Sequence, residues 1–578
     1  ANAPDYSSRY FVPDLNGNLY TLDKTTKAFT PYLNAASIFP NFDTNPGFSA
    51  GLVTIQFDPD YANPASSHYG MFYTTHTEID PKINPTDFRV GVLTAWQDTN
   101  INDNVFTGTH HEMLRVTYSG NIHPLGDISF NPNAHPGDAD YDMMYISSGD
   151  GSAGESGTTA TRNQDQMLNN YLGKILRIQP NSLQGLAGTA PDSTTYNIPS
   201  DNPFASSTFT SAGAKGEIWA YGFRNPHRMS WDAQTGNLIV DNIGLHSYEM
   251  IDIVHKGADY GYSKIEGNQP LSSAGGSTFN LVTNTTLPNT LPVWVNNTTA
   301  FNGMTITPSY PVAEYSHQDG DAIASGFVYH GAKIPQLLGK YVFGDISTGR
   351  LFYTDYSSML AQDAENNGTG NPLTMPAIHE LQVYYSGSEM RVFDIVRNEF
   401  DLRNDGVNDG DHLPGQADNT DGVDPYGVAY GGGRADIRWA LGTDNELYLI
   451  SKSDGMIRQL LNFGDYTGIA GDFNFDGKFN NLDVQAMLNA LKASSTFMST
   501  HNLANADWLA LADFNHDGSV SVADLQGALV ALTSSSLQQP VPEPATLSLL
   551  AVGLLLGKRL YRKRPGSSYL RRSANCMK

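Results

Sequence analysis

The sequence predicts a mainly β protein, a β-propeller followed by a small helical domain. Apolar stretches, turns of Asp, Asn and Gly, and short aromatic or β-branched strands recur at residues 14–20, 231–240, 349–353 and 443–450. This plan is typical of a sandwich, a barrel or a propeller, and its recurrence along so much of the chain favours the propeller. After Asp465 the apolar residues instead recur at helical spacing, in 484–491 and 525–532.

Composition and charge limit the classes of function. A chain of 578 residues exceeds the size of one ordinary core, so we expect more than one domain. The 59 acidic residues outnumber the 34 basic ones, and the net charge of −25 repels phosphate backbones. We therefore expect no nucleic acid partner and favour divalent cations. The single cysteine, Cys576, excludes disulfides within the chain and cysteine-ligated zinc or iron–sulfur sites.

Shifts in composition suggest the domain boundaries. We expect a propeller over 1–465, paired acidic loops with helices over 470–533, a proline-rich linker over 534–544, and a sorting or membrane segment over 545–578. Insertions rich in Ser, Thr, Asn, Asp and Gly are expected to be loops on the rim of the propeller, at 182–214, 265–310 and 400–432. The first residue, Ala1, is consistent with removal of a signal peptide.

Two twelve-residue loops, Asp472 to Asp483 and Asp513 to Asp524, have the pattern of calcium ligands. Each has oxygen side chains at positions 1, 3, 5, 9 and 12, glycine at 6 and an apolar residue at 8. Calcium takes six or more oxygens, the glycine permits the turn, and position 7 contributes its carbonyl. The alternative is a helical hairpin with two acidic turns and no metal. The predicted ligands are Asp472, Asn474, Asp476, Lys478, Asn480, Asp483, Asp513, Asn515, Asp517, Ser519, Ser521 and Asp524.

The two loops and their helices resemble the dockerin family over residues 470–533. Position 12 is Asp in both loops, at Asp483 and Asp524, where calcium sensors use Glu. The resemblance implies that calcium folds this small domain rather than regulating it. It also implies that the domain could dock a cohesin-like protein partner, although similar pairs occur as plain appendages.

The end of the chain predicts export. Val541-Pro-Glu-Pro544 precedes an uncharged run, 545–557, and a cluster of lysine and arginine at 558–564. The run is marginal for a hydrocarbon core about 30 Å thick, so it could be a signal-type apolar region, a buried helix or a short span. Basic residues stay cytoplasmic, which places everything before Val541 outside.

This order resembles the PEP-CTERM sorting signal of Gram-negative bacteria, which implies processing by an exosortase. The extension 565–578 departs from that pattern, which usually ends at the basic cluster. We therefore expect an exported protein at the cell surface or outside the cell, anchored transiently or permanently at its C-terminal hydrophobic helix.

Several segments of the first 460 residues, in order along the chain, resemble the soluble glucose/sorbosone dehydrogenase family. They are 51–61, 123–130, 145–151, 172–178, 222–228, 249–262 and 339–345. The resemblance implies a six-bladed propeller that binds pyrroloquinoline quinone (PQQ) and oxidises aldose-type sugars to lactones. The sugar and the electron acceptor stay undetermined.

The resemblance assigns roles to named residues. His123 matches the family's base, and the pKa range of histidine suits removal of a hydroxyl proton at neutral pH. Arg224 and Asn225 match the pair beside the quinone, where a guanidinium stabilises developing negative charge. The alternatives are a turn histidine and a structural Arg-Asn-Pro turn. Asp150 and Arg162 could line the pocket or form a surface ion pair.

The family's calcium position falls on residues 241–244 and Glu249, of which Gly244 and Glu249 are the predicted ligands. Tyr248 occupies a second ligand position and cannot supply a carboxylate, which weakens the site. The three carboxylates of PQQ require cations. Arg434 and Arg438 are the predicted cations, whereas the family's lysine and glutamine positions are occupied by Ser347 and Ser49.

Three hypotheses follow from these residues. The first is an exported PQQ-dependent sugar dehydrogenase with His123 as base. The second is a catalytically silent propeller that acts as a surface binding module, as in the hedgehog-interacting branch that resembles the same family. The third is a structural surface protein displayed through its calcium loops. Ser347 and Ser49 favour the second hypothesis, because a pocket short of cations could bind PQQ weakly, differently or not at all.

Overall fold

The computed structural model of this chain divides into two units. The first comprises 1–330, 337–382 and 391–458, and the second comprises 331–336, 383–390 and 459–578. The structure describes all residues except 6, 44–49, 80–88, 119, 121, 154–158, 184–194, 273–279, 282–286, 370–374, 386–387, 406–433, 463–469, 476–477, 502, 504, 516–518 and 537–578.

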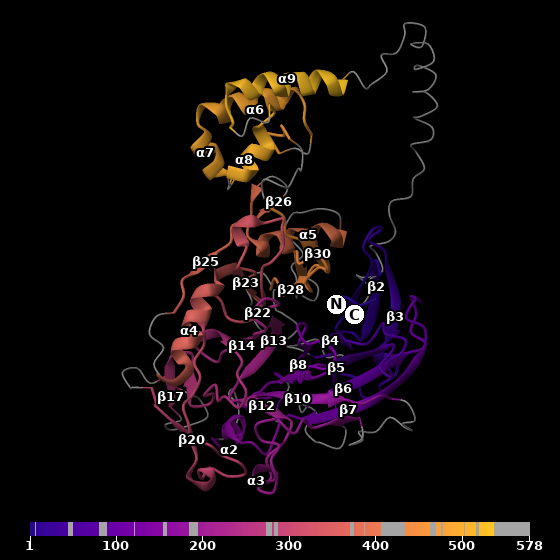
Figure 1. The fold of residues 1–578 in the computed structure, drawn as a ribbon, viewed down its shortest axis with the longest axis vertical. Coiled ribbons are helices and arrows are strands. Elements are labelled where there is room, and N and C mark those ends of the chain that lie inside the picture. The colour runs from indigo at the N-terminus through magenta and orange to yellow at the C-terminus, as the bar shows by residue number, and fades with distance from the viewer. Residues whose placement is uncertain are drawn as a thin grey trace. The chain divides into compact units, whose positions relative to one another are not determined.

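Six antiparallel sheets follow one another through the first unit (Figure 1). The first three contain β1 (Arg9–Pro13), β2 (Asn18–Asp23) and β3 (Phe29–Asn34); β4 (Leu52–Phe57), β5 (Met71–Ile79), β6 (Arg89–Asp98) and β7 (Gly108–Thr117); and β8 (Leu125–Phe130), β9 (Met144–Ser148), β10 (Lys174–Pro180), β11 (Tyr196–Asn197) and β12 (Ile218–Tyr221).

The next three sheets contain β13 (Asn225–Trp231), β14 (Leu238–Ile243), β15 (Tyr248–Ile253) and β21 (Ala313–Ser316); β22 (Ile323–Val328), β23 (Lys340–Asp345), β24 (Leu351–Asp355) and β25 (Ile378–Glu380); and β28 (Ile437–Leu441), β29 (Leu447–Ser451) and β30 (Met456–Gln459). Each sheet is built mainly from strands consecutive in sequence, because short turns join antiparallel neighbours at low entropic cost.

The first strands of successive sheets, β1, β4, β8, β13, β22 and β28, contact one another in that order. The ring closes where Asn2 Nδ2 donates a hydrogen bond to the Leu441 carbonyl (3.0 Å) and the rings of Tyr10 and Tyr448 pack edge to face. The first unit is therefore a six-bladed β-propeller, which confirms the propeller part of the predicted fold class.

Four of these inner strands carry an extra residue early in the strand. The pairing of β4, β8, β13 and β22 with the next strand shifts by one residue between positions 52 and 54, 125 and 128, 226 and 228, and 323 and 326. A bulge turns side chains and backbone groups toward neighbouring strands. Accordingly, Asp127 accepts hydrogen bonds from Thr54 Oγ1 (2.9 Å) and Met229 N (3.1 Å), and Ser325 Oγ accepts one from Trp439 N (2.8 Å). The bulges therefore link adjacent blades.

The propeller also contains helices that the repeated strand pattern did not predict. These are α2 (Thr159–Arg162), α3 (Ser207–Thr210), α4 (Tyr356–Thr369) and α5 (Val392–Asp405). The expected rim loop 265–310 contains short strands, β16 (Ile265–Glu266), β17 (Gln269–Ser272), β18 (Asn280–Leu281), β19 (Leu291–Pro292) and β20 (Thr305–Ile306). Helix α5 enters the expected loop 400–432, and most of that loop lies outside the described residues.

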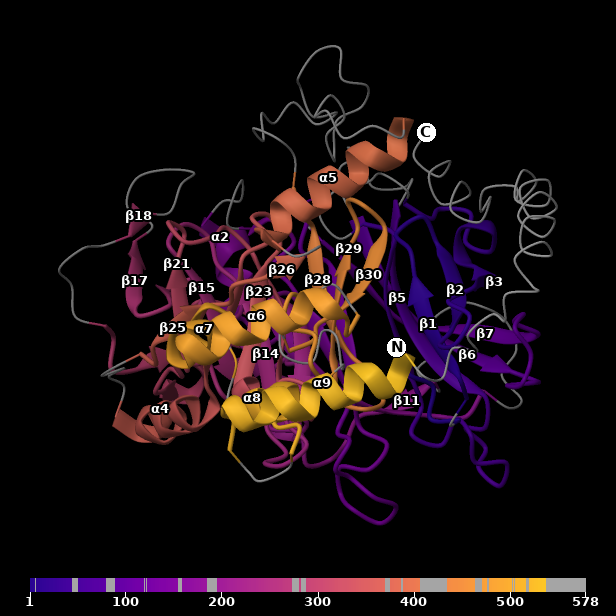
Figure 2. The ribbon, with the colours of Figure 1, turned by 90° about the horizontal axis from the view of Figure 1, so that it is seen from above.

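The second unit contains a small strand pair, β26 (Tyr384–Tyr385) and β27 (Ser388–Glu389), and four helices among its described residues. They are α6 (Asn481–Lys492), α7 (Ser494–Thr500), α8 (Asn505–Ala512) and α9 (Val522–Ser536). Helices α6 and α9 confirm the helical periods and lie beside each other (Figure 2). Phe473, Met487, Trp508, Leu511 and Ala528 pack into one core.

The predicted linker and sorting segment are not described beyond residue 536. Among the described parts of the chain, no helix is long and apolar enough to cross a bilayer. The predicted C-terminal hydrophobic helix therefore stays a prediction.

A histidine between two carboxylates joins the second and third blades. His68 Nδ1 lies 3.0 Å from Asp58 Oδ2 and 3.5 Å from Asp142 Oδ1, and Asp58 also accepts a hydrogen bond from the Tyr73 hydroxyl (2.6 Å). Burial opposes the charged imidazolium, but hydrogen bonds and charge attraction from Asp142 and Asp58 outweigh it and raise the pKa of His68 to about 10.

We expect this contact to make stability depend on pH. A raised pKa stabilises the folded state fully below the unfolded pKa of about 6.5, and that contribution is lost as the pH rises toward 10. His68→Gln should lower the free energy of unfolding by roughly 2–4 kcal/mol at pH 6 and by much less at pH 10. Urea unfolding of both proteins at the two pH values measures this, and a difference that does not change with pH would contradict it.

Candidate functional site

The candidate residues lie just before, or at the beginning of, the inner strands of the propeller. His123 precedes β8 by two residues, Arg224 directly precedes β13 and Arg434 precedes β28 by three. Because the inner strands lie side by side around the ring, their beginnings meet at one end of it. Residues separated by three hundred positions in sequence are thus brought to one region.

His123 is paired with a buried carboxylate. Its Nδ1 lies 2.6 Å from Asp150 Oδ1, which also accepts the Ser152 backbone N–H (3.1 Å). Asp150 is fully buried and His123 is 8% exposed. A carboxylate on Nδ1 places the proton there and leaves Nε2 as a proton acceptor. His123 has a left-handed backbone (φ 57°), which directs its side chain away from the ordinary strand path.

Gly149 lets this pair approach the neighbouring blade. A Cβ at position 149 would lie 2.6 Å from the His123 carbonyl and 3.1 Å from Asn225 Oδ1. Asp150 N donates a hydrogen bond to the Arg224 carbonyl (2.7 Å). The histidine pair and the Arg224-Asn225 pair are therefore parts of one site. The interpretation of Asp150 and Arg162 as a surface ion pair is wrong, because both side chains are buried.

Arg224 is a buried cation held by carbonyl groups. Its Nη1 donates to the carbonyls of Ile243 (3.2 Å) and Gly244, and the side chain is 5% exposed. Asn225 N donates to Asn242 Oδ1 (3.1 Å), which fixes the start of β13 against β14. Carbonyl dipoles stabilise the guanidinium. The Arg224 cation therefore lies in the same site as Asp150 and His123.

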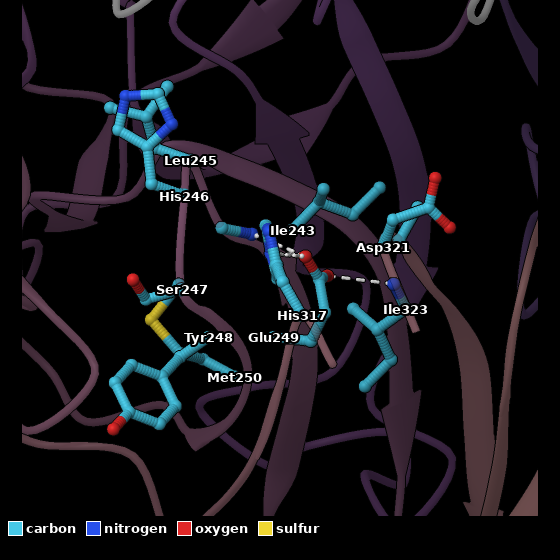
Figure 3. A network of polar contacts seen from close by, with 12 residues as sticks. Ile243, Leu245, His246, Ser247, Tyr248, Glu249, Met250, His317, Asp321 and Ile323 are labelled. Atoms are coloured by element: carbon cyan, nitrogen blue, oxygen red, sulfur yellow. Dashed lines mark hydrogen bonds and ion pairs between the residues drawn. The ribbon is translucent and has the colours of Figure 1, made fainter. Parts of the chain in front are cut away.

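Glu249 is at the centre of a second network (Figure 3). Its Oε1 contacts His317 Nε2 (2.8 Å) and accepts the Gly244 N–H (3.3 Å), and its Oε2 accepts the Ile323 N–H (2.7 Å). Burial raises the pKa of Glu249 to about 7, although the hydrogen bond from His317 opposes this. Leu245 to Tyr248 are held by Glu266 Oε1, which accepts their four backbone N–H groups.

Glu249 and Gly244 do not fit a calcium ion in this arrangement. Calcium requires several converging oxygens. Here both Glu249 oxygens face nitrogen donors, and the Gly244 carbonyl faces the Arg224 guanidinium. The guanidinium and the histidine occupy the places where a cation would contact these oxygens. Sequence reasoning did not identify His317, because nothing in the local sequence marks it.

Four cations gather near the beginning of β28. Arg434 Nε lies 3.3 Å from Asp436 Oδ1 and Lys452 Nζ lies 3.6 Å from Asp436 Oδ2. Arg438, on β28, donates to the Ile437 carbonyl (2.6 Å). Burial first, and then repulsion from Arg228 and Arg434, lowers the pKa of Arg438 to about 9. Arg434 and Arg438 were predicted from the sequence, whereas Arg228 and Lys452 were not.

The two serine positions are less informative. Ser347 is 8% exposed, and its carbonyl accepts the Ala435 N–H (3.0 Å), so it lies beside the segment that carries Arg434. Ser49 lies outside the described residues.

The acidic loops of the second unit repeat one geometry. Asp483 accepts the N–H groups of Asn474 (3.1 Å) and Asn480 (2.9 Å), and Asp524 accepts those of Asn515 (3.2 Å) and Ser521 (2.8 Å). The carboxylate at position 12 thus closes each loop from position 3 to position 9. Asp472, Asp483 and Asp524 are fully buried, Asp513 is partly buried, and Lys478 and Ser519 are exposed. Asp476 and Asp517 lie outside the described residues.

Comparison with known proteins gives two family matches. Residues 1–330 match the family described as Glucose / Sorbosone dehydrogenase. Residues 540–564 match the PEP-CTERM protein-sorting motif.

Curated relatives are similar over parts of the chain. The HIPL1 protein of Arabidopsis thaliana is 28% identical over 242 residues, 39% of this chain and 28% of that protein. The hedgehog-interacting protein of Mus musculus is 23% identical over 66% of this chain and 45% of its own length. An aldose sugar dehydrogenase of Escherichia coli is 38% identical over 65 residues, 11% of this chain and 16% of that protein. The chain thus spans less than half the length of these relatives.

Solved structures with a similar chain path include two aldose sugar dehydrogenases. The soluble enzyme of Escherichia coli in its apo form has a TM-score of 0.45 and 17% identity, covering 79% of this chain and 93% of that one. The PQQ-bound enzyme of Streptomyces coelicolor has a TM-score of 0.42 and 18% identity, covering 79% of this chain and 91% of that one.

Proposed function

Because the chain belongs to the glucose/sorbosone dehydrogenase family, we propose that it is a PQQ-dependent dehydrogenase that oxidises aldose-type sugars to lactones. The observation that carries the proposal is the pairing of His123 with buried Asp150, directly beside the buried cation of Arg224. A base with a fixed tautomer and an adjacent positive charge are the two protein groups that this oxidation needs.

His123 is the proposed catalytic residue. Its Nε2 removes the proton of the C1 hydroxyl of the sugar while C1 loses a hydride, which leaves the C1=O double bond of a lactone. Asp150 is the positioning residue, because it holds Nδ1 and stabilises the imidazolium that forms.

PQQ, when bound, supplies the two-electron acceptor for the hydride. The residues present fit a planar tricarboxylate, since Arg224, Arg228, Arg434, Arg438 and Lys452 provide cations in one region. Arg224 is fixed by the carbonyls of Ile243 and Gly244, so it stabilises negative charge that develops on the acceptor without reorganising. Asn225, at the start of β13, would bind beside it. Calcium at Glu249 has no part in this proposal.

Asp150→Asn tests the positioning role. The amide keeps the shape but removes the charge that stabilises the imidazolium, so we expect kcat to fall about 10- to 1,000-fold. The acidic limb of the kcat profile should move to lower pH, a change that mere loss of packing would not produce. Asp138→Asn, at an exposed turn, is the matched control and should match wild type. An unchanged pH profile in Asp150→Asn would refute the role.

The direct test is reconstitution. The full chain without cofactor is incubated with PQQ, and dye reduction is measured with a panel of aldoses. We expect turnover with at least one aldose and a lactone product by mass spectrometry. Absence of PQQ binding at micromolar concentration would refute the enzyme proposal.

A second candidate is a catalytically silent propeller that acts as a surface binding module. The similarity to the HIPL1 and hedgehog-interacting proteins favours it, as does the uncharged Ser347 at a family cation position. This candidate predicts a folded protein that binds no PQQ, so the reconstitution distinguishes the two.

We further propose that residues 470–533 form a dockerin-like domain folded by two calcium ions. Two fully buried carboxylates in one short loop, Asp472 and Asp483, repel each other unless a cation lies between them. The PEP-CTERM motif supports export, exosortase processing and a location at the cell surface of a Gram-negative-type bacterium. Within this proposal the propeller covers 1–465, the linker 534–544 and the sorting segment 545–578, and a cohesin-like partner is a further expectation.

A further inference from the structure

Two cations in the propeller have no counterpart in the residues that the family resemblance assigned. Arg228 lies on the inner strand β13, and its Nη2 donates to the Val53 carbonyl of β4 (3.4 Å). It therefore reaches from the fourth blade to the second. Lys452 directly follows β29 in the sixth blade, and its backbone N–H donates to the Asp436 carbonyl (3.1 Å).

These cations belong to one cluster with Arg434 and Arg438. Asp436 lies within 3.6 Å of Lys452 Nζ and 3.3 Å of Arg434 Nε, so one carboxylate connects two of them. Burial, followed by the charges of Arg438, Arg228 and Lys452, holds the pKa of His227 well below its usual range, and the charge of His123 acts in the same direction. His227, 2% exposed, is thus close enough to the cluster and to the proposed base to feel the charge of both.

The cluster carries excess positive charge in a place that solvent reaches. The side chains of Lys452 and Arg434 are 36% and 19% exposed, so both are partly buried and partly open to solvent. The pKa of Lys452 is lowered by burial, an effect that Asp436 opposes and that Arg438 and Arg434 reinforce. Clustered cations repel each other, and an anion bound among them would relieve that repulsion.

The residue at position 347 explains why an anion site here would need a cation from another strand. The family resemblance places a lysine there, and this chain has Ser347. The Ser347 carbonyl contacts Ala435, between Arg434 and Asp436, and Asp436 contacts Lys452. Lys452, which contacts the same short segment, can thus supply the positive charge that Ser347 lacks.

We propose that Lys452 and Arg228 bind carboxylates of PQQ together with Arg434 and Arg438, with Lys452 replacing the cation absent at Ser347. This inference rests on the proposed function. The shared chemistry is that of an aromatic polycarboxylate, so trimesate (benzene-1,3,5-tricarboxylate), which cannot accept a hydride, is the probe that separates anion binding from quinone binding.

Isothermal titration of the full chain with PQQ tests the proposal without any assay of activity. Lys452→Met should weaken PQQ binding about 10- to 100-fold, the range expected for loss of one charge-assisted contact. It should also reduce the dependence of binding on salt. Arg228→Met should weaken binding in the same direction. Lys492→Met, at the exposed end of α6, is the matched control and should bind as wild type does.

Moving the positive charge from position 452 to position 347 distinguishes loss of that charge from simple loss of folding. Ser347→Lys added to Lys452→Met restores the cation at the family position and should recover most of the lost affinity. Equal PQQ binding by wild type and Lys452→Met would overturn the inference and leave the proposed function intact. Absence of PQQ binding by wild type, with trimesate bound in a Lys452-dependent way, would overturn the proposed function and the PQQ assignment together.

Discussion

Replacing His123 by glutamine lowers kcat for aldose oxidation by about 10²–10⁴-fold, the contribution typical of a positioned general base. Glutamine retains a hydrogen-bonding side chain of similar length, so it can still contact Asp150. It has no titratable nitrogen, and therefore it cannot accept the hydroxyl proton. The measurement is steady-state dye reduction by the reconstituted full chain with its best aldose.

Two controls isolate the chemical step in this experiment. PQQ binding by His123→Gln, measured by titration, should stay within a few-fold of wild type, because the cations proposed to bind PQQ belong to other residues. His135→Gln alters an exposed turn histidine, 81% exposed, and should retain wild-type kcat. Full turnover by His123→Gln would exclude the base assignment while sparing the fold.

Removing calcium with EDTA should unfold the helical domain. Asp472, Asp483 and Asp524 are fully buried carboxylates, and without a cation their mutual repulsion and desolvation oppose folding. In such small domains the free energy of ion binding contributes directly to the free energy of folding, because the unfolded chain has no preformed site. We expect the domain's cooperative thermal transition to disappear in EDTA and to return with excess calcium but not with magnesium, which prefers a tighter octahedral shell.

Asp483→Asn with Asp524→Asn is the matched variant for this prediction. Asparagine keeps an oxygen for one of the two N–H groups that each carboxylate accepts and removes the charge at position 12. The double variant should lose the calcium-dependent transition. Persistence of that transition in EDTA would instead support the alternative in which the carboxylates only cap the helices. In α6, Asn480 and Asp483 do form such a capping box.

EDTA should affect the two units differently. Glu249 and Gly244 face donors and a guanidinium, so the proposed dehydrogenase activity should survive chelation that unfolds the helical domain. Loss of activity under the same conditions would show that the propeller requires calcium after all.

Local patterns favoured a propeller and predicted the α6 and α9 helices, whereas the number of blades came from the family resemblance. Strands rich in aromatic and β-branched residues with Asp, Asn and Gly turns have a short-range cause, since turn chemistry and side-chain period act over a few residues. The helices α4 and α5 were missed, because their sequences are more polar than those of α6 and α9 and resemble the surrounding polar segments. The same locality explains why His123 and Arg224 were found: each sits in a short motif.

The sequence by itself determined the class of fold, the acidic loops and the sorting tail, because each depends on neighbouring residues, whereas the family resemblance pointed to the candidate base. Only the tertiary structure decided that Asp150 is buried and paired with His123, that Glu249 faces nitrogen donors and that the Gly244 carbonyl faces a guanidinium. It also decided that Arg228 and Lys452 join Arg434 and Arg438. Those contacts connect different blades, and their partners follow from how the inner strands meet around the ring, which no local pattern encodes.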